Sequence, residues 1–207
     1  IPIVLKGVII KKDGETINID SEKENIIFSI TDLLPHLARK QYEKKLSEAI
    51  EGENLNVLIG SKPLKDEKEE KVKSNILKYL NEKYGICEED FVSSELTLVP
   101  YGDAKEIGFD KSMILGYGHD DRSCAFSGFY AIFNSEKPKR WSIVFLIDKE
   151  EIGSEGNTSA QSILFDEILL KFVNDYKELI TIYSKSSVLS GDVNAAFDPN
   201  YKEVFEP

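Results

Sequence analysis

Carboxylate side chains follow three apolar runs of the chain, each at the point where the run ends. The carboxylates are Asp120, Glu150, Glu151 and Asp192, and the runs are residues 113–117, 141–148 and 186–189. If these runs are neighbouring strands, their carboxyl ends meet at one edge of a sheet, where open α/β sheets bind their ligands. Carboxylates gathered there repel one another, and a divalent cation removes that repulsion. The pattern therefore predicts a metal-dependent hydrolase site.

The oxygen atoms available suit two cations, but they do not choose the metal, because oxygen ligands accept zinc, manganese or cobalt. A bidentate aspartate could bridge two ions about 3.5–4 Å apart. Adjacent Glu150 and Glu151 point apart if the backbone there is extended, so we expect one to bind metal and the other to act as a general base. The alternative is a solvated acidic surface, the usual place for carboxylate pairs in an acidic chain.

The composition bounds the class of protein. The 207 residues carry 37 acidic and 26 basic side chains, for a net charge of -11, which argues against a nucleic-acid-binding protein. No apolar run approaches the length of a membrane span, and no signal segment opens the chain, so we expect no membrane partner. Cys87 and Cys124 lack C-x-x-C spacing and indicate reduced thiols in a cytoplasmic protein.

Residues 1–100 are predicted to be strand-rich. Two strands flank Lys12-Asp13-Gly14-Glu15, because Asp-Gly between β-rich runs is typical of a hairpin. Further strands are predicted over residues 25–30, 55–59 and 95–100, and helices over residues 39–50 and 72–84, the second ending at Gly85.

Residues 101–207 alternate between strand and helix patterns, which predicts an α/β fold with a mostly parallel central sheet. The five apolar residues 143–147 are typical of a central strand covered on both faces. Helices are predicted over residues 123–133 and from Thr158 or Ser159, either of which can cap the helix, to Phe172.

Several segments together resemble signatures of the aspartyl aminopeptidase and vacuolar-type aminopeptidase I family, in the family's order. They are Gly116-Tyr117-Gly118-His119-Asp120-Asp121-Arg122, Asp148-Lys149-Glu150-Glu151-Ile152-Gly153-Ser154-Glu155-Gly156, and Ser190-Gly191-Asp192-Val193 with Asp198-Pro199-Asn200-Tyr201. Asp32-Leu33-Leu34-Pro35-His36-Leu37 resembles the family's interface segment.

The resemblance implies a two-zinc aminopeptidase that removes single N-terminal residues from peptides, with acidic residues as candidates for the preferred one. Asp120 would bridge the zinc ions, and Glu151 and Asp192 would each bind one of them. Glu150 would act as the catalytic general base, passing a proton from water to the departing amine. Asp121 is expected to be a helix N-terminal residue or an outer acceptor.

The resemblance also implies the domain organisation. Residues 1–100 would be an inserted dimerisation (lid) domain, and residues 101–207 the central part of the catalytic domain. The family assembles into dimers and larger closed homo-oligomers, in which His36 would reach the substrate in a neighbouring subunit.

The histidines depart from the family pattern, which supplies a His-x-Asp segment early and one histidine near the end. His36 and His119 occupy neither position. We therefore expect the N- and C-terminal parts of the catalytic domain to lie outside residues 1–207, and this piece alone to bind zinc weakly or not at all. The rival hypothesis is a non-catalytic assembly or interaction subunit that keeps the fold without metals.

Overall fold

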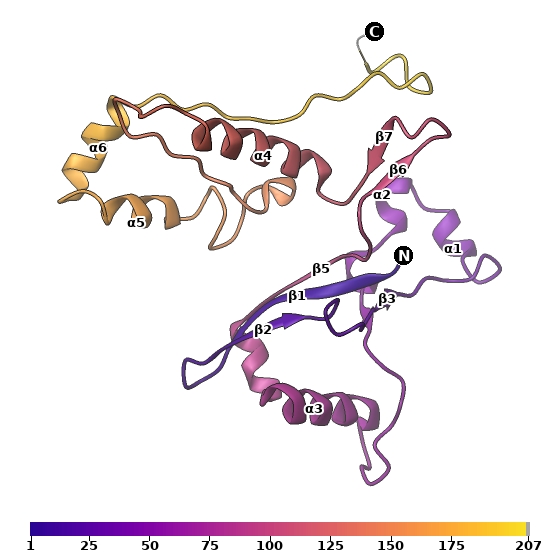
Figure 1. Ribbon diagram of the computed structural model, residues 1–207. Helices are drawn as coiled ribbons and strands as arrows, with labels where there is room; N and C mark the ends of the chain where they lie inside the picture. The colour runs from indigo at the N-terminus through magenta and orange to yellow at the C-terminus, as the bar shows by residue number, and fades with distance from the viewer. Residues whose placement is uncertain (206–207) are drawn as a thin grey trace. The chain divides into compact units, whose positions relative to one another are not determined.

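The computed structural model describes residues 1–205 and divides the chain into two compact units, residues 1–117 and 118–207 (Figure 1). The first unit is built on a three-stranded antiparallel sheet with the order β2-β1-β5. Its elements are β1 (Ile3–Ile10), β2 (Thr16–Asp20), β3 (Ser29–Ile30), α1 (Arg39–Tyr42), α2 (Leu46–Ala49), β4 (Val57–Leu58), α3 (Lys71–Tyr84), β5 (Ser94–Pro100), β6 (Lys105–Ile107) and β7 (Met113–Leu115), with 3₁₀ helices η1 (Gly52–Asn54) and η2 (Glu88–Ser93).

The predicted hairpin joins β1 to β2. The Lys11 N–H donates to the Glu15 carbonyl at 2.8 Å, and Gly14 takes a left-handed φ of 87° between them. Aspartate and glycine favour such a turn because one supplies a side-chain acceptor and the other tolerates positive φ. The hairpin prediction is confirmed.

A small apolar core forms where α3 meets the sheet. Ile9, Ile19 and Ile86 are buried there, and Leu80 and Tyr84 of α3 pack against them. Helix α3 ends as predicted, because Gly85 adopts a left-handed φ of 66° that other residues rarely take.

The second unit contains helices with irregular chain between them. Its elements are α4 (His119–Phe133), η3 (Glu150–Ile152), α5 (Leu164–Leu170) and α6 (Tyr176–Ser184). Leu169 of α5 and Leu179 of α6 are buried, and these two helices contact each other. Among the residues that the structure describes, no helix has both the length and the apolar character needed to cross a membrane.

Residues 141–148 make contacts on two sides, but the predicted cover on both faces is wrong, because Ile143, Leu146 and Ile147 are exposed. Trp141 and Phe145 contact Phe172 and Phe165, with ring centroids 6.0 and 4.0 Å apart. Val144 faces the other way, since a Cβ built on Gly128 of α4 would lie 3.6 Å from its Cγ1. This alternation is that of an extended chain.

The strands predicted over residues 141–148 and 186–189 are not formed within the described residues, because neither run pairs in a ladder there. The described strands all pair antiparallel, including β7 with β6, so a parallel sheet is not confirmed. A strand needs a hydrogen-bonded neighbour, and apolar residues of the run stay exposed, Leu146 at 64%.

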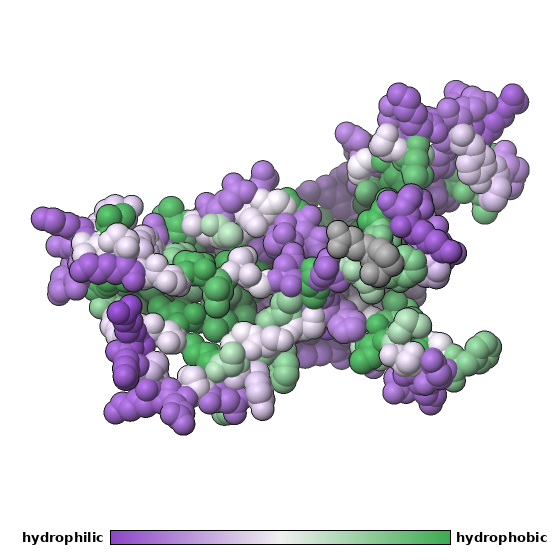
Figure 2. All heavy atoms as spheres, turned by 90° about the horizontal axis from the view of Figure 1, so that it is seen from above, coloured by the Kyte–Doolittle hydropathy of each residue, from purple (hydrophilic) through white to green (hydrophobic). Residues whose placement is uncertain are grey.

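Figure 2 shows apolar side chains gathered on this unit.

Other predicted helices and strands differ from the structure, because local hydrogen bonds compete with the predicted elements. The helix predicted over residues 39–50 is split into α1 and α2, and the strands at residues 25–30 and 55–59 shorten to β3 and β4. The predicted helix cap at Ser159 is absent, because its hydroxyl donates to loop carbonyls, and α5 begins only at Leu164. Helix α6 was not predicted, although Asp175 accepts the Glu178 N–H at 2.8 Å as an N-cap.

Gly7 of β1 provides a test of the sheet. A Cβ at this position would lie 2.0 Å from the Glu95 carbonyl oxygen, and φ is 148°. We expect Gly7→Ala to lower the free energy of unfolding by about 3 kcal/mol, because the β1–β5 pairing must shift. Urea denaturation measures the change. Gly52→Ala is the control, since a Cβ there meets nothing within 4 Å; equal midpoints for the two variants would contradict this packing.

Candidate metal centre

Two acidic side chains lie in the first turn of α4. Gly118 precedes the helix in a left-handed conformation with φ of 63°, and Asp120 and Asp121 follow it. The Asp121 N–H donates to Asp120 Oδ1 at 2.7 Å, and Ser123 Oγ donates to the Asp120 carbonyl at 2.8 Å. Carboxylates are favoured at this end of a helix because its unpaired N–H groups carry partial positive charge.

The second acidic segment is a single 3₁₀ turn, η3. It is framed by left-handed residues, Lys149 with φ of 69° before it and Gly153 with φ of 90° after it. The expectation of extended backbone at Glu150 and Glu151 is therefore wrong. Their side chains still diverge, because successive residues of a 3₁₀ helix are rotated by about 120°.

Carboxylates from these two segments form one cluster, called here the acidic cluster: Asp120, Asp121 and Glu151. One oxygen from each lies within 4.8 Å of the others, and all three residues are exposed. No salt bridge neutralises them among the residues that the structure describes. Chain segments about 30 residues apart in sequence therefore bring three negative charges together.

Electrostatic repulsion within this region raises the pKa of Glu151 above its ordinary value. The charge of Asp120 is the largest cause, followed by Glu150, Asp121, burial and Asp192. Ionising all of these carboxylates together therefore costs free energy, and a bound cation would remove that cost. The oxygen donors fit zinc, although a zinc site has about four ligands and usually includes imidazole.

The structure brings together some of the predicted site residues. Asp120 and Glu151 share the acidic cluster, while Glu150 and Asp192 lie near enough for their charges to act on Glu151. Asp192 Oδ1 accepts the Val193 N–H at 2.7 Å. His36 belongs to the first unit, in the segment before α1. The ligand and base roles of these residues stay predictions.

Asp121 is expected from the sequence to be a helix N-terminal residue or an outer acceptor, and it lies in the first turn of α4 as well as in the acidic cluster. Its adjacency to Asp120 at the start of a predicted helix was the available signal. Two neighbouring residues in a first helical turn can both face an incoming segment, and the sequence does not show which of them meets η3.

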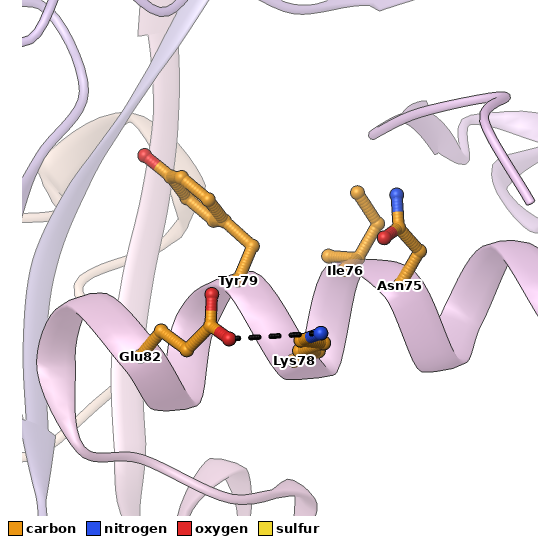
Figure 3. A pocket seen from close by; sticks show the side chains of 5 residues that line it. All are labelled: Asn75, Ile76, Lys78, Tyr79 and Glu82. Atoms are coloured by element: carbon orange, nitrogen blue, oxygen red, sulfur yellow. Dashed lines mark ion pairs between the residues drawn. The ribbon is translucent and has the colours of Figure 1, made fainter. Parts of the chain in front are cut away.

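A separate hollow of about 360 Å³ lies along α3 in the first unit, lined by Asn75, Ile76, Lys78, Tyr79 and Glu82 (Figure 3). Lys78 and Glu82 form an ion pair across it, with Nζ and Oε1 3.8 Å apart. None of the predicted site residues lines it. Its other polar groups also have partners, since Asn75 Nδ2 donates to the Lys62 carbonyl and Lys83 Nζ donates to the Tyr79 hydroxyl, so the acidic cluster remains the candidate site.

Removing one cluster charge should stabilise the metal-free protein. Because the folded-state pKa of Glu151 is raised, its ionisation opposes folding above that pKa, and protonation relieves the penalty below it. We expect Glu151→Gln to raise the thermal unfolding midpoint of metal-free protein at pH 7. The difference should shrink as the pH falls toward 4.5, the ordinary glutamate value.

Calorimetry of metal-free samples checks this expectation, with Glu136→Gln as the control because Glu136 lies outside the cluster. With zinc present the sign should reverse, since the variant has lost a candidate ligand. A metal-free Glu151→Gln protein less stable than its parent at pH 7 would show that the cluster is not under repulsive strain.

Comparison with known proteins identifies the family of this chain. The family model "Aminopeptidase I zinc metalloprotease (M18)" matches residues 2–207. A relative from Clostridium acetobutylicum, "Probable M18 family aminopeptidase 1", is 50% identical over 100% of this chain and 46% of its own length. The chain thus spans about half the length of the curated relatives it matches.

Solved structures are similar to this chain over its whole length. The crystal structure of aminopeptidase I from Clostridium acetobutylicum is similar with a TM-score of 0.81 and 51% identity, covering 100% of this chain and 46% of that one. The M18 aminopeptidase from Thermotoga maritima gives a TM-score of 0.81 at 42% identity, covering 100% and 47%. The family expected from the signature segments is confirmed: this chain belongs to the M18 aminopeptidase I family of zinc metalloproteases.

Proposed function

We propose that the full-length protein is a zinc-dependent aminopeptidase that hydrolyses the N-terminal residue from peptides. The observation that carries the proposal is the acidic cluster, which joins the start of α4 to η3 in a chain of this metalloprotease family. The proposed substrates are peptides, and the proposed preferred N-terminal residue is acidic.

The ligand set is proposed as follows. When zinc is bound, Asp120 would be the ligand shared by two ions, Glu151 would hold one of them and Asp192 the other. Asp192 stands outside the cluster of oxygens within 4.8 Å, which suits a ligand of the second ion. The remaining ligands, including imidazole, come from outside residues 1–207. When bound, zinc supplies Lewis-acid polarisation of the scissile carbonyl.

Glu150 is proposed as the general base. It lies next to Glu151 in η3, and its charge adds to the repulsion there, so it is close to the cluster without belonging to it. From that position its carboxylate can accept a proton from the attacking water and return it to the departing amine. Asp121, inside the cluster, is a further candidate to hold a ligand in place.

We further propose that residues 141–148 and 186–189 become strands of a mostly parallel sheet in the full-length protein. The alternating contacts of residues 141–148 leave their backbone edges available for neighbours. Residues 1–100 then serve as the dimerisation (lid) domain, within dimers and larger closed homo-oligomers in which His36 reaches a neighbouring subunit. Exposed Leu33, Leu34 and Leu37 around His36 support a self-association surface.

A reducing compartment such as the cytoplasm is part of the proposal, because Cys87 and Cys124 are free thiols. Oxidised surroundings would leave the exposed Cys87 open to intermolecular pairing.

Hydrolysis of an aminoacyl reporter by the full-length protein tests the proposed function. We expect Glu150→Gln to lower kcat by roughly 10²- to 10⁴-fold, the usual contribution of a general base, with its zinc content unchanged. A chelator should abolish the activity and zinc should restore it. Glu136→Gln is the matched control, and its kcat should equal that of the parent.

Two other outcomes discriminate between the hypotheses. An unchanged kcat in Glu150→Gln would assign the base to another residue. A zinc-loaded parent protein with no hydrolysis of any aminoacyl reporter would favour the non-catalytic assembly subunit.

A further inference from the structure

The segment that carries the candidate ligands, residues 148–162, is called here the ligand loop. Its first half is closed by the backbone. The Lys149 carbonyl accepts the N–H groups of Ile152 at 3.3 Å and Ser154 at 2.8 Å, and the Gly153 N–H donates to the Glu150 carbonyl at 2.9 Å. These bonds shape η3 without any contribution from the acidic cluster.

The returning half of the ligand loop is anchored by a buried hydroxyl. Ser159 is 5% exposed, and its Oγ donates to the Gly156 carbonyl at 2.9 Å and also to the Ser154 carbonyl. Ser162 Oγ donates to the Ser159 carbonyl at 2.7 Å. Ser159 and Gln161 already connect the two halves, since the Gln161 N–H donates to the Ser154 carbonyl at 3.3 Å and its Nε2 donates to the Gly153 carbonyl.

The Lys149 side chain spans the two halves. It is 18% exposed, and its Nζ donates to Thr158 Oγ1 at 3.0 Å while lying 3.6 Å from Asp148 Oδ2. Its methylene stem covers Gly156, where a Cβ would come within 3.3 Å of Lys149 Cδ. The Lys149 side chain therefore contacts Asp148, ahead of η3, and also the segment that returns after η3.

The backbone of Lys149 makes this placement costly for a lysine. Its φ of 69° is left-handed, a conformation in which glycine is favoured over residues with a Cβ. Glycine at this position would relieve the backbone but would supply no bond across the ligand loop. The same conformation directs η3, and with it the Glu151 carboxylate, toward the first turn of α4.

We propose that Lys149 is a positioning residue, which clamps the ligand loop through Thr158 and thereby sets the protein's affinity for zinc by holding Glu151 against Asp120. The proposal rests on the proposed function for the identity of the metal. Lys149 itself touches neither substrate nor metal, and acts through the orientation of Glu151. Outer residues that orient a ligand commonly change metal affinity by about 10- to 100-fold when they are replaced.

The full-length protein tests the proposal through zinc affinity, measured by competition with a chromophoric chelator. Lys149→Met keeps the methylene stem and removes the ammonium, and we expect about 10-fold weaker zinc binding. Thr158→Val removes the acceptor at the other end and should weaken binding similarly. The double variant should lose no more than Lys149→Met alone, because the bond to Thr158 is already broken in that variant.

Amide hydrogen exchange of the metal-free protein gives a readout independent of metal and activity. The amides of Ile152, Gly153 and Ser154 should exchange faster in Lys149→Met than in the parent. Lys149→Arg, which keeps a donor, should recover most of the protection and the affinity. Lys177→Met, an exposed lysine of α6, is the control and should change neither.

Unchanged zinc affinity and unchanged exchange in Lys149→Met would overturn the proposal, and so would an additive loss in the double variant. Failure of the proposed function looks different. In that case the parent itself binds no zinc or hydrolyses no reporter, while the exchange experiment still reports whether Lys149 holds the ligand loop.

Discussion

Repulsion between carboxylates is the constraint on which this chain is organised. In a molecule of net charge -11, Asp120, Asp121 and Glu151 are held within 4.8 Å of one another. Free side chains would separate to relieve such crowding, so the backbone must prevent it. The start of α4 and the turn η3 do this because each is bonded internally and neither depends on the other. Gly118 and Gly153 take positive φ without strain, whereas the positive φ of Lys149 is the local strain that accompanies this arrangement.

Features encoded by neighbouring residues could be predicted from the sequence. The Asp13-Gly14 hairpin and the end of α3 at Gly85 each follow from local rules of turn and cap chemistry. The helix predicted over residues 123–133 is present, but α4 begins four residues earlier, at His119. Residues 141–148 could not be predicted in the same way, because strand formation depends on partners far away in sequence. Their apolar pattern predicted a strand covered on both faces, but Ile143, Leu146 and Ile147 are exposed, and the pattern does not show which strands would pair with the run.

The residues of the candidate site could be predicted from the sequence, but their backbone conformation could not. Family signatures and run ends pointed to Asp120, Glu150, Glu151 and Asp192, and the structure brings Asp120 and Glu151 into one cluster. The relation of Glu150 to Glu151 was derived from extended backbone, whereas the chain makes a 3₁₀ turn there. The turn depends on Lys149 being left-handed, which residue types alone do not indicate.

The pairing of β1 with β5 has a consequence for how the protein is made. Ile3 lies opposite Pro100 in this ladder, so the centre of the sheet awaits a partner encoded more than ninety residues later. The β1–β2 hairpin can form early during translation, but one edge of β1 stays open until β5 leaves the ribosome. Closing so long a loop is slow relative to local structure. During that interval the exposed edge can accept a strand from another nascent chain, which makes late emergence of β5 the step most sensitive to chaperone supply.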